Sequence, residues 1–192
     1  MQAQWQNQRA DKMSALLSLP RIKNQTAFNL SRWDELAKVP EIERWPGRVE
    51  TDRFGQIIVS HHTEYSHGGR QVNIGSLLRK YLPSGKTTVE TPISTSEGIK
   101  VADVAWVSKA RLTKIGGRAA LKAAPEICVE VLSPKNTRNE IEEKRRLYFE
   151  AGAQEVWILE RTGALRFFLS TAPEKAASKS KLCPKAPSRL ED

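Results

Sequence analysis

The stretch Ala124-Pro125-Glu126-Ile127-Cys128-Val129-Glu130-Val131-Leu132-Ser133-Pro134 decides the fold. Its β-branched and apolar residues predict a buried strand over 126–132, opened by Pro125 and broken by Ser133-Pro134. Glu130 stands among apolar neighbours in this strand. An ionised carboxylate in such a setting is costly unless a partner balances its charge. Glu130 therefore marks a candidate site.

A second short strand, predicted over 101–107, carries Asp103 in a similar apolar setting. Hard carboxylate oxygens bind Mg²⁺ or Mn²⁺, and such an ion polarises a phosphodiester and lowers the pKa of an attacking water. Two carboxylates on neighbouring strands therefore suggest a divalent-cation site. Structural alternatives are open: Asp103 could accept hydrogen bonds from a turn, and Glu130 could pair with a basic residue of the core.

Lys144 follows in a helix predicted over 138–151, on the same face as Tyr148. A lysine beside a two-carboxylate site adds positive charge where the transition state of phosphodiester cleavage gathers negative charge. The alternative is ordinary: the run 140–146 is highly charged, as solvated helix faces are, and Glu140 could pair with Lys144.

Two upstream residues could join the site. Glu50, in a predicted hairpin strand, could be a third carboxylate, or simply an exposed strand residue. His67 precedes Gly68-Gly69 and a predicted helix, and could shuttle a proton, contact phosphate or only cap the helix. A zinc cluster of His67 with His61 and His62 is conceivable, but the spacing matches no common ligand pattern.

The order of predicted elements indicates one α/β domain with a mixed sheet and packed helices. Residues 1–28 are expected to form an arm or amphipathic helix, and 171–192, rich in Lys, Ser, Ala and Pro, a disordered basic tail. The domain between them, 29–170, is predicted to contain a helix capped by Ser31, a hairpin over 48–60 turning at Gly55, a helix from Gly68 to Leu82, strands at 87–91, 101–107, 126–132, 155–160 and 165–169, a basic loop over 111–122, and the helix 138–151.

Composition narrows the classes of function. The 192 residues carry a formal net charge of +9, which favours a polyanionic partner. The two cysteines, Cys128 and Cys183, lie in such different settings that both are expected to be free thiols. The sequence has no apolar run of membrane-spanning length and no signal-peptide core, so we expect a cytoplasmic protein. Nucleotide-binding glycine motifs and nucleophile elbows are absent from it.

At these residues the sequence resembles the Uma2 family of restriction-endonuclease-like proteins, within the PD-(D/E)XK nuclease superfamily. The resemblance runs from about Leu30 to Phe168, and its most specific part is 125–134, followed by Asn136-Thr137-Arg138, Lys144, Tyr148 and 152–159. Three departures stand out: Ala102 where a proline usually precedes the Asp, Val156 where the family has Tyr, and a more basic segment over 108–124.

The resemblance implies a restriction-endonuclease-like core, a mixed sheet flanked by helices. It implies that Asp103 and Glu130 bind Mg²⁺, with the carbonyl of Val131 as a possible further ligand, and that Glu50 is an extra carboxylate of the site. The superfamily lysine would stand at Leu132, and the family instead places it in the next helix, where Lys144 lies.

The sequence therefore predicts a Mg²⁺- or Mn²⁺-dependent DNA endonuclease, with Asp103, Glu130, Lys144, Glu50 and His67 as its site. Phosphates would be held by the basic segment and the tail, and two-strand cutting would favour a homodimer. A non-catalytic nucleic-acid-binding module on the same fold is the alternative, and a protein whose charge serves only solubility is a weaker one. The residues predicted to bind phosphate are Lys109, Arg111, Lys114, Arg118 and Lys122 of the basic segment and Lys175, Lys179, Lys181 and Lys185 of the tail.

Overall fold

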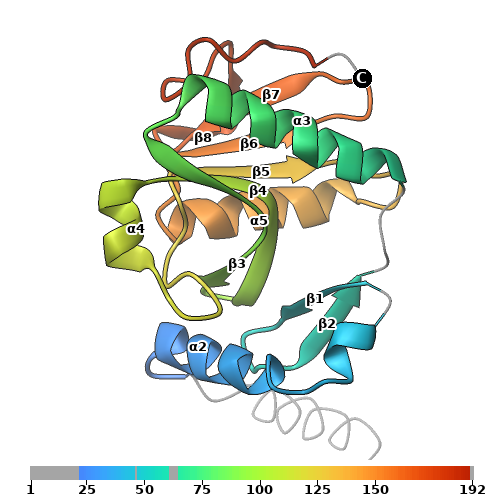
Figure 1. Ribbon diagram of the computed structural model, residues 1–192, viewed down its shortest axis with the longest axis vertical. Helices are drawn as coiled ribbons and strands as arrows, with labels where there is room; N and C mark the ends of the chain where they lie inside the picture. The colour runs from blue at the N-terminus through green and yellow to red at the C-terminus, as the bar shows by residue number, and fades with distance from the viewer. Residues whose placement is uncertain (1–21, 46, 61–64, 191–192) are drawn as a thin grey trace, which may run out of the picture.

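A six-stranded mixed sheet forms the centre of the protein (Figure 1). The computed structural model describes residues 22–45, 47–60 and 65–190. The strand order is β3-β4-β5-β6-β7-β8, in which β5 and β6 run parallel and all other neighbours antiparallel. The strands are β3 (Gly85–Thr95), β4 (Gly98–Ser108), β5 (Ile127–Val131), β6 (Glu155–Leu159), β7 (Leu165–Leu169) and β8 (Ala172–Ala177).

Helices cover both faces of this sheet, so its central strands are apolar on both sides. Helix α3 (Tyr65–Tyr81) packs Ile74 and Leu78 against one face, which includes Val129 and Trp157. Helix α5 (Arg138–Glu150), the crossover between β5 and β6, packs Tyr148 against the other face. The remaining helices are α2 (Gln25–Leu36), the 3₁₀ helix η1 (Ile42–Arg44) and α4 (Lys109–Ile115).

A separate hairpin of β1 (Arg48–Thr51) and β2 (Ile57–Ser60) lies beside the start of β4 (Figure 1). Gly55 turns it with φ +77°, a left-handed conformation that glycine adopts without steric cost. Thr51 ties the hairpin to the main sheet: its hydroxyl accepts from the Ile99 N–H at 2.9 Å, and its carbonyl accepts from Lys100 Nζ at 3.2 Å. The hairpin predicted over 48–60 is confirmed.

The α/β fold class is confirmed, and most predicted elements are present with shifted ends. The helix predicted from Ser31 begins at Gln25, because the side chain of Asn24, not Ser31, caps it by accepting from the Ala27 N–H at 3.0 Å. The basic loop predicted over 111–122 is wrong in its first part, where α4 forms with Ser108 as its N-cap. Of the predicted arm, 1–21 lie outside the described residues.

The prediction of a disordered tail over 171–192 is wrong for residues 171–190. Residues 172–177 form β8 along the edge of β7, and the chain then returns to the core, where Cys183 is buried. Glu155 anchors this return: its carboxylate accepts from Ser180 Oγ at 2.6 Å and from the N–H groups of Lys181 and Leu182 at 2.7 and 2.8 Å. Composition misses such a segment because its few apolar residues, such as Cys183 and Ala186, join the core only in the folded structure.

Two smaller expectations concern thiols and membranes. Cys128 and Cys183 are both free, as predicted. No helix within the described ranges is long and apolar enough to cross a bilayer.

Glu155→Ala should loosen the C-terminal segment. Glu155 is 1% exposed and also accepts from Trp157 Nε1 at 2.7 Å, so its removal leaves several buried donors without an acceptor. We expect a loss of about 3 kcal/mol in the free energy of unfolding by urea, with faster proteolysis after β7. The exposed Glu174→Ala, which breaks a rim pair with Arg145, is the control. Equal stability of the two variants would contradict the anchoring role.

Candidate active site

The site lies where β4 and β5 separate. Their register pairs Val104 with Val129, and its next step would place Asp103 opposite Glu130, but the pairing has ended there. The Val131 N–H, which would otherwise lack a partner on this side, donates instead to Asp103 Oδ2 at 2.5 Å. Two carboxylates are thus buried side by side, Asp103 1% and Glu130 3% exposed.

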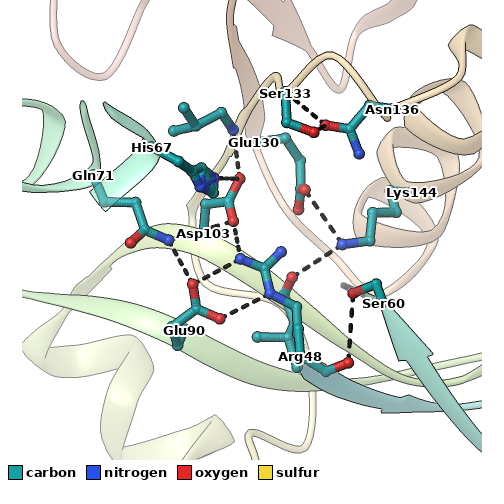
Figure 2. Close-up of polar contacts among 12 residues, drawn as sticks. Arg48, Ser60, His67, Gln71, Glu90, Asp103, Glu130, Ser133, Asn136 and Lys144 are labelled. Carbon is teal, nitrogen blue, oxygen red and sulfur yellow. Dashed lines mark hydrogen bonds and ion pairs between the residues drawn. The ribbon is translucent and has the colours of Figure 1, made fainter. Parts of the chain in front are cut away.

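Arg48 of β1 neutralises Asp103 (Figure 2). Its Nη2 donates to Asp103 Oδ1, and its Nε and Nη2 also donate to the two oxygens of Glu90 at 2.8 and 2.7 Å. Planar guanidinium is well suited to such two-pronged contacts with a carboxylate. Gln71 of α3 donates to the same Glu90 at 2.5 Å. Asp103, Glu90 and Arg48 therefore form one ionic group.

Lys144 of α5 neutralises the second carboxylate. Its Nζ lies 3.3 Å from Glu130 Oε2 and 2.9 Å from Glu50 Oε1, and it also donates to the Val101 carbonyl at 3.1 Å. Tyr148, one helical turn further on, donates its hydroxyl to Glu130 Oε1 at 2.7 Å. The i, i+4 spacing places both side chains on the face of α5 that meets β5.

A cavity of about 800 Å³ opens over these groups. The carboxylates line it, and polar side chains of the loop after β5 form part of its wall. Ser133 and Asn136 of that loop bond to each other at 2.9 Å, which holds the loop against the start of α5 (Figure 2). The lining includes Arg48, Glu50, His67, Glu90, Lys100, Asp103, Glu130, Val131, Ser133, Lys135, Asn136 and Lys144.

Burial and charge act in opposite directions on these groups. Burial raises the pKa of Glu130 to about 7, although Lys144 lowers it. Burial would also raise the pKa of Glu50, but Lys144 and the Val101 N–H hold it below its usual value. Burial disfavours charge on Lys144, yet Glu130 and Glu50 raise its pKa, so it remains an ammonium. The pKa of Arg48 is raised against burial by Asp103, Glu130 and Glu90.

His67 is a neutral, unsatisfied imidazole. It is 4% exposed, and burial lowers its pKa despite the opposing effect of Asp103. Its Nε2 lies 3.3 Å from Asp103 Oδ2, but neither ring nitrogen has hydrogen-bonding geometry to any partner in the described part of the chain. A buried nitrogen without a partner is costly, which indicates that His67 faces a ligand or water in the working site.

The donor set suits a hard divalent cation. Asp103 and Glu130 offer carboxylate oxygens, and the four carboxylates here, with Glu50 and Glu90, outnumber the three cations Arg48, Lys100 and Lys144. Burial is the main cause of the raised pKa of Glu130, and a cation bound beside it would favour its ionised form. Within 22–45, 47–60 and 65–190, however, no three His, Cys, Asp or Glu residues form a ready-made ligand cluster, because Arg48 and Lys144 stand between the carboxylates.

The structure brings all five predicted site residues together at the cavity, and Val131 lines it too. Lys144 is 7% exposed, so the alternative of a solvated helix face is wrong. Glu140 does not pair with it, and instead accepts from Asn136 Nδ2 at 3.4 Å. The alternative for Glu130, a basic partner in the core, describes its surroundings correctly, because Lys144 pairs with it. His61 and His62 lie outside the described residues.

Sequence reasoning missed two members of the site. Arg48 stands two residues before Glu50 in a strand, and this period-2 spacing on one face could have indicated it. Glu90 gave no signal, because it lies in an ordinary polar strand and reaches the site only through the pairing of β3 with β4, which places it across from Asp103. Arg111, predicted to hold phosphate, is instead structural: it donates to the carbonyls of Ala124 and Gly152 at 2.7 and 2.5 Å.

Comparison with known proteins places this site in a family. Residues 33–175 match Uma2, a family described as "Putative restriction endonuclease". The chain belongs to this family. The match spans the hairpin, α3, the central strands and α5, and so includes every residue of the site described above. A search of curated proteins finds no match.

A solved structure supports the fold. A protein from Anabaena variabilis, described as a "putative nuclease" belonging to DUF820, superimposes with a TM-score of 0.59 at 18% sequence identity. The superposition covers 76% of this chain and 82% of that one. At this identity the likeness establishes a shared fold, that is, the arrangement of the sheet and its helices.

Glu130→Gln should change how stability depends on pH. Burial raises the pKa of Glu130 from 4.5 to about 7. The folded protein therefore holds this proton more tightly than the unfolded chain and loses stability as the pH rises through this window. With a chelator present, we expect the variant to gain on the order of 2 kcal/mol relative to wild type between about pH 5 and about pH 8, measured by urea unfolding. Glu35→Gln on the exposed face of α2 is the control, and parallel pH profiles of wild type and Glu130→Gln would refute the raised pKa.

Proposed function

We propose that this protein is a DNA endonuclease that depends on Mg²⁺ or Mn²⁺ and hydrolyses phosphodiester bonds with water. The observation that carries the proposal is the buried pair Asp103 and Glu130 at the open end of β4 and β5, flanked by the buried ammonium of Lys144. Membership of a restriction-endonuclease-like family supports the class of reaction.

Asp103 and Glu130 would hold the cation, with the Val131 carbonyl as a further ligand. When bound, Mg²⁺ supplies polarisation of the phosphodiester and lowers the pKa of the attacking water. Glu50 positions Lys144 at 2.9 Å and keeps it charged. The ammonium can then stabilise negative charge in the transition state or orient the water. The neutral His67, with free ring nitrogens next to Asp103, can accept a proton.

Basic side chains outside the cavity would bind the DNA backbone. Lysines of α4 and of the C-terminal segment are exposed and contribute to the net charge of +9. Such contacts attract phosphates without reading sequence, so they would fix orientation and affinity. Two-strand cleavage by one site per chain would favour a homodimer, and a cytoplasmic location would suit a DNA substrate.

A non-catalytic nucleic-acid-binding module is the second candidate. The observation that favours it is that Asp103 and Glu130 already have the cationic partners Arg48 and Lys144 without an ion. Such a module would bind DNA in a salt-sensitive manner and would keep that binding after Asp103→Ala and Glu130→Ala.

Calorimetric titration of Mn²⁺ into wild type and Glu130→Ala, with plasmid nicking in the same buffers, separates the two candidates. We expect metal binding and nicking in the wild type and the loss of both in the variant, because Glu130 supplies a ligand oxygen. Glu142→Ala, on the exposed side of α5, is the control and should behave as wild type. If the wild-type protein binds DNA but neither binds Mn²⁺ nor nicks plasmid, the endonuclease is ruled out and the non-catalytic DNA-binding module remains.

Lys144→Met should separate chemistry from metal binding. The ammonium is predicted to act on the transition state, so its loss should slow nicking at least about 100-fold. Mn²⁺ binding should persist or strengthen, because the variant removes a positive charge that competes for Glu130. The exposed Lys38→Met is the matched control. Unchanged nicking by a folded Lys144→Met would remove Lys144 from the mechanism.

A further inference from the structure

Arg48 stands where a cation bound to Asp103 would stand. Its side chain is 16% exposed, and Nη2 contacts Asp103 Oδ1, the oxygen that the Val131 N–H leaves free. The same nitrogen, together with Nε, is also bonded to Glu90. Figure 2 shows the guanidinium between Asp103 and Glu90, and Lys144 pairs with Glu50 at 2.9 Å. One cation thus joins the candidate ligand Asp103 to a carboxylate without a role in the proposed chemistry.

Glu90 is held in a special backbone conformation at this point. Its φ is +45°, and among the described residues it is the one non-glycine residue with a positive φ. It lies between the pairs Val89–Val104 and Thr91–Ala102 of the β3–β4 register, which puts it across from Asp103. The left-handed region is unfavourable for residues with a side chain and persists where the surroundings impose it, often at functional sites. Here it accompanies the two-pronged contact with Arg48.

We propose that Arg48 is an internal competitor of the divalent cation, and that Glu90 is the position to which its guanidinium withdraws when the cation binds. The proposal rests on the proposed function, since it concerns the same cation. Without metal, Nη2 neutralises Asp103. With metal, Nη2 leaves Asp103, and the contacts with Glu90 keep the guanidinium at the wall of the cavity.

Elementary electrostatics requires this exchange. A guanidinium and a divalent cation on the same carboxylate repel each other strongly at contact distance in a partly buried site. Arg48 cannot yield by losing its proton, because Asp103, Glu130 and Glu90 favour its charged form. It must therefore move, and the affinity for metal is lowered by whatever free energy holds Nη2 on Asp103. Arg48 is on this account a positioning residue that sets the metal concentration at which the site fills.

Calorimetric titration of Mn²⁺ into Arg48→Met tests the proposal. Methionine keeps the apolar stem and removes the charge, so we expect Mn²⁺ to bind at least tenfold more tightly than in wild type. The matched control is Arg166→Met on β7, which removes one positive charge outside the cavity and should bind Mn²⁺ within about twofold of wild type. Tightening in Arg48→Met alone supports the proposal.

Other outcomes overturn it in distinguishable ways. Equal or weaker binding by Arg48→Met than by wild type, with Mn²⁺ bound by both, overturns the competition and leaves the metal-dependent function intact. Equal tightening in Arg166→Met assigns the effect to net charge and also overturns it. Failure of both wild type and Arg48→Met to bind Mn²⁺ overturns this proposal together with the metal dependence of the proposed function.

Thermal unfolding provides a second measurement that does not depend on calorimetry. Removing Arg48 leaves buried Asp103 without its cation, so Arg48→Met should melt below wild type in EDTA, and Mn²⁺ should raise its Tm by more than it raises that of wild type. If Arg48→Met does not fold, Arg48→Gln serves instead, since glutamine removes the charge but can still donate a hydrogen bond to Asp103. Its Mn²⁺ affinity should exceed that of wild type, and a lower affinity would overturn the proposal.

Discussion

The burial of Asp103 and Glu130 at the separated ends of β4 and β5 is the constraint on which the rest of the site depends. Two carboxylates removed from water at neighbouring positions repel each other and lose hydration, so each needs a cation or a hydrogen-bond donor close by. Strand β5 supplies one donor, the Val131 N–H on Asp103, but no strand residue pairs directly with Glu130 in the described part of the chain. Other elements must therefore bring positive charge to this one point of the sheet.

Two elements far apart in the chain meet this need. The β1–β2 hairpin delivers Arg48 to Asp103, and α5 delivers Lys144 to Glu130 (Figure 2). Glu50 joins the two, because it lies on the hairpin and pairs with Lys144 of the helix. The hairpin has no core of its own and is attached through contacts with β4, so the ionic group also determines where the hairpin rests.

The ionic network has a consequence for function as well as for stability. A site balanced by its own side chains is stable without a ligand, whereas a site with surplus carboxylates attracts one. This protein combines both features, since Arg48 covers Asp103, whereas burial raises the pKa of Glu130 and the ring nitrogens of His67 have no hydrogen-bond partner among the described residues. If a cation binds Asp103, the proposed chemistry would include a rearrangement in which the Arg48 guanidinium releases Asp103 and keeps its contacts with Glu90.

The sequence by itself determined the α/β class, the buried strand with Glu130 and the helix with Lys144. These signals are local: a charged residue in an apolar run and an apolar face with helical spacing can be recognised without knowing what lies opposite. Local reasoning failed for α4, and for the C-terminal segment, whose order comes from backbone donors that meet Glu155.

Only the tertiary structure decided how the charges are paired. No spacing in the chain indicates that Glu90, in a left-handed conformation on β3, receives Arg48 of a separate hairpin, or that Lys144 bridges Glu50 and Glu130. Such pairings depend on how the strands twist and on where the crossover helix α5 packs against the sheet, and neither can be inferred from a short stretch of residues. The sequence thus determined which charged groups are buried, and the fold decided which cations and hydrogen-bond donors stabilise them.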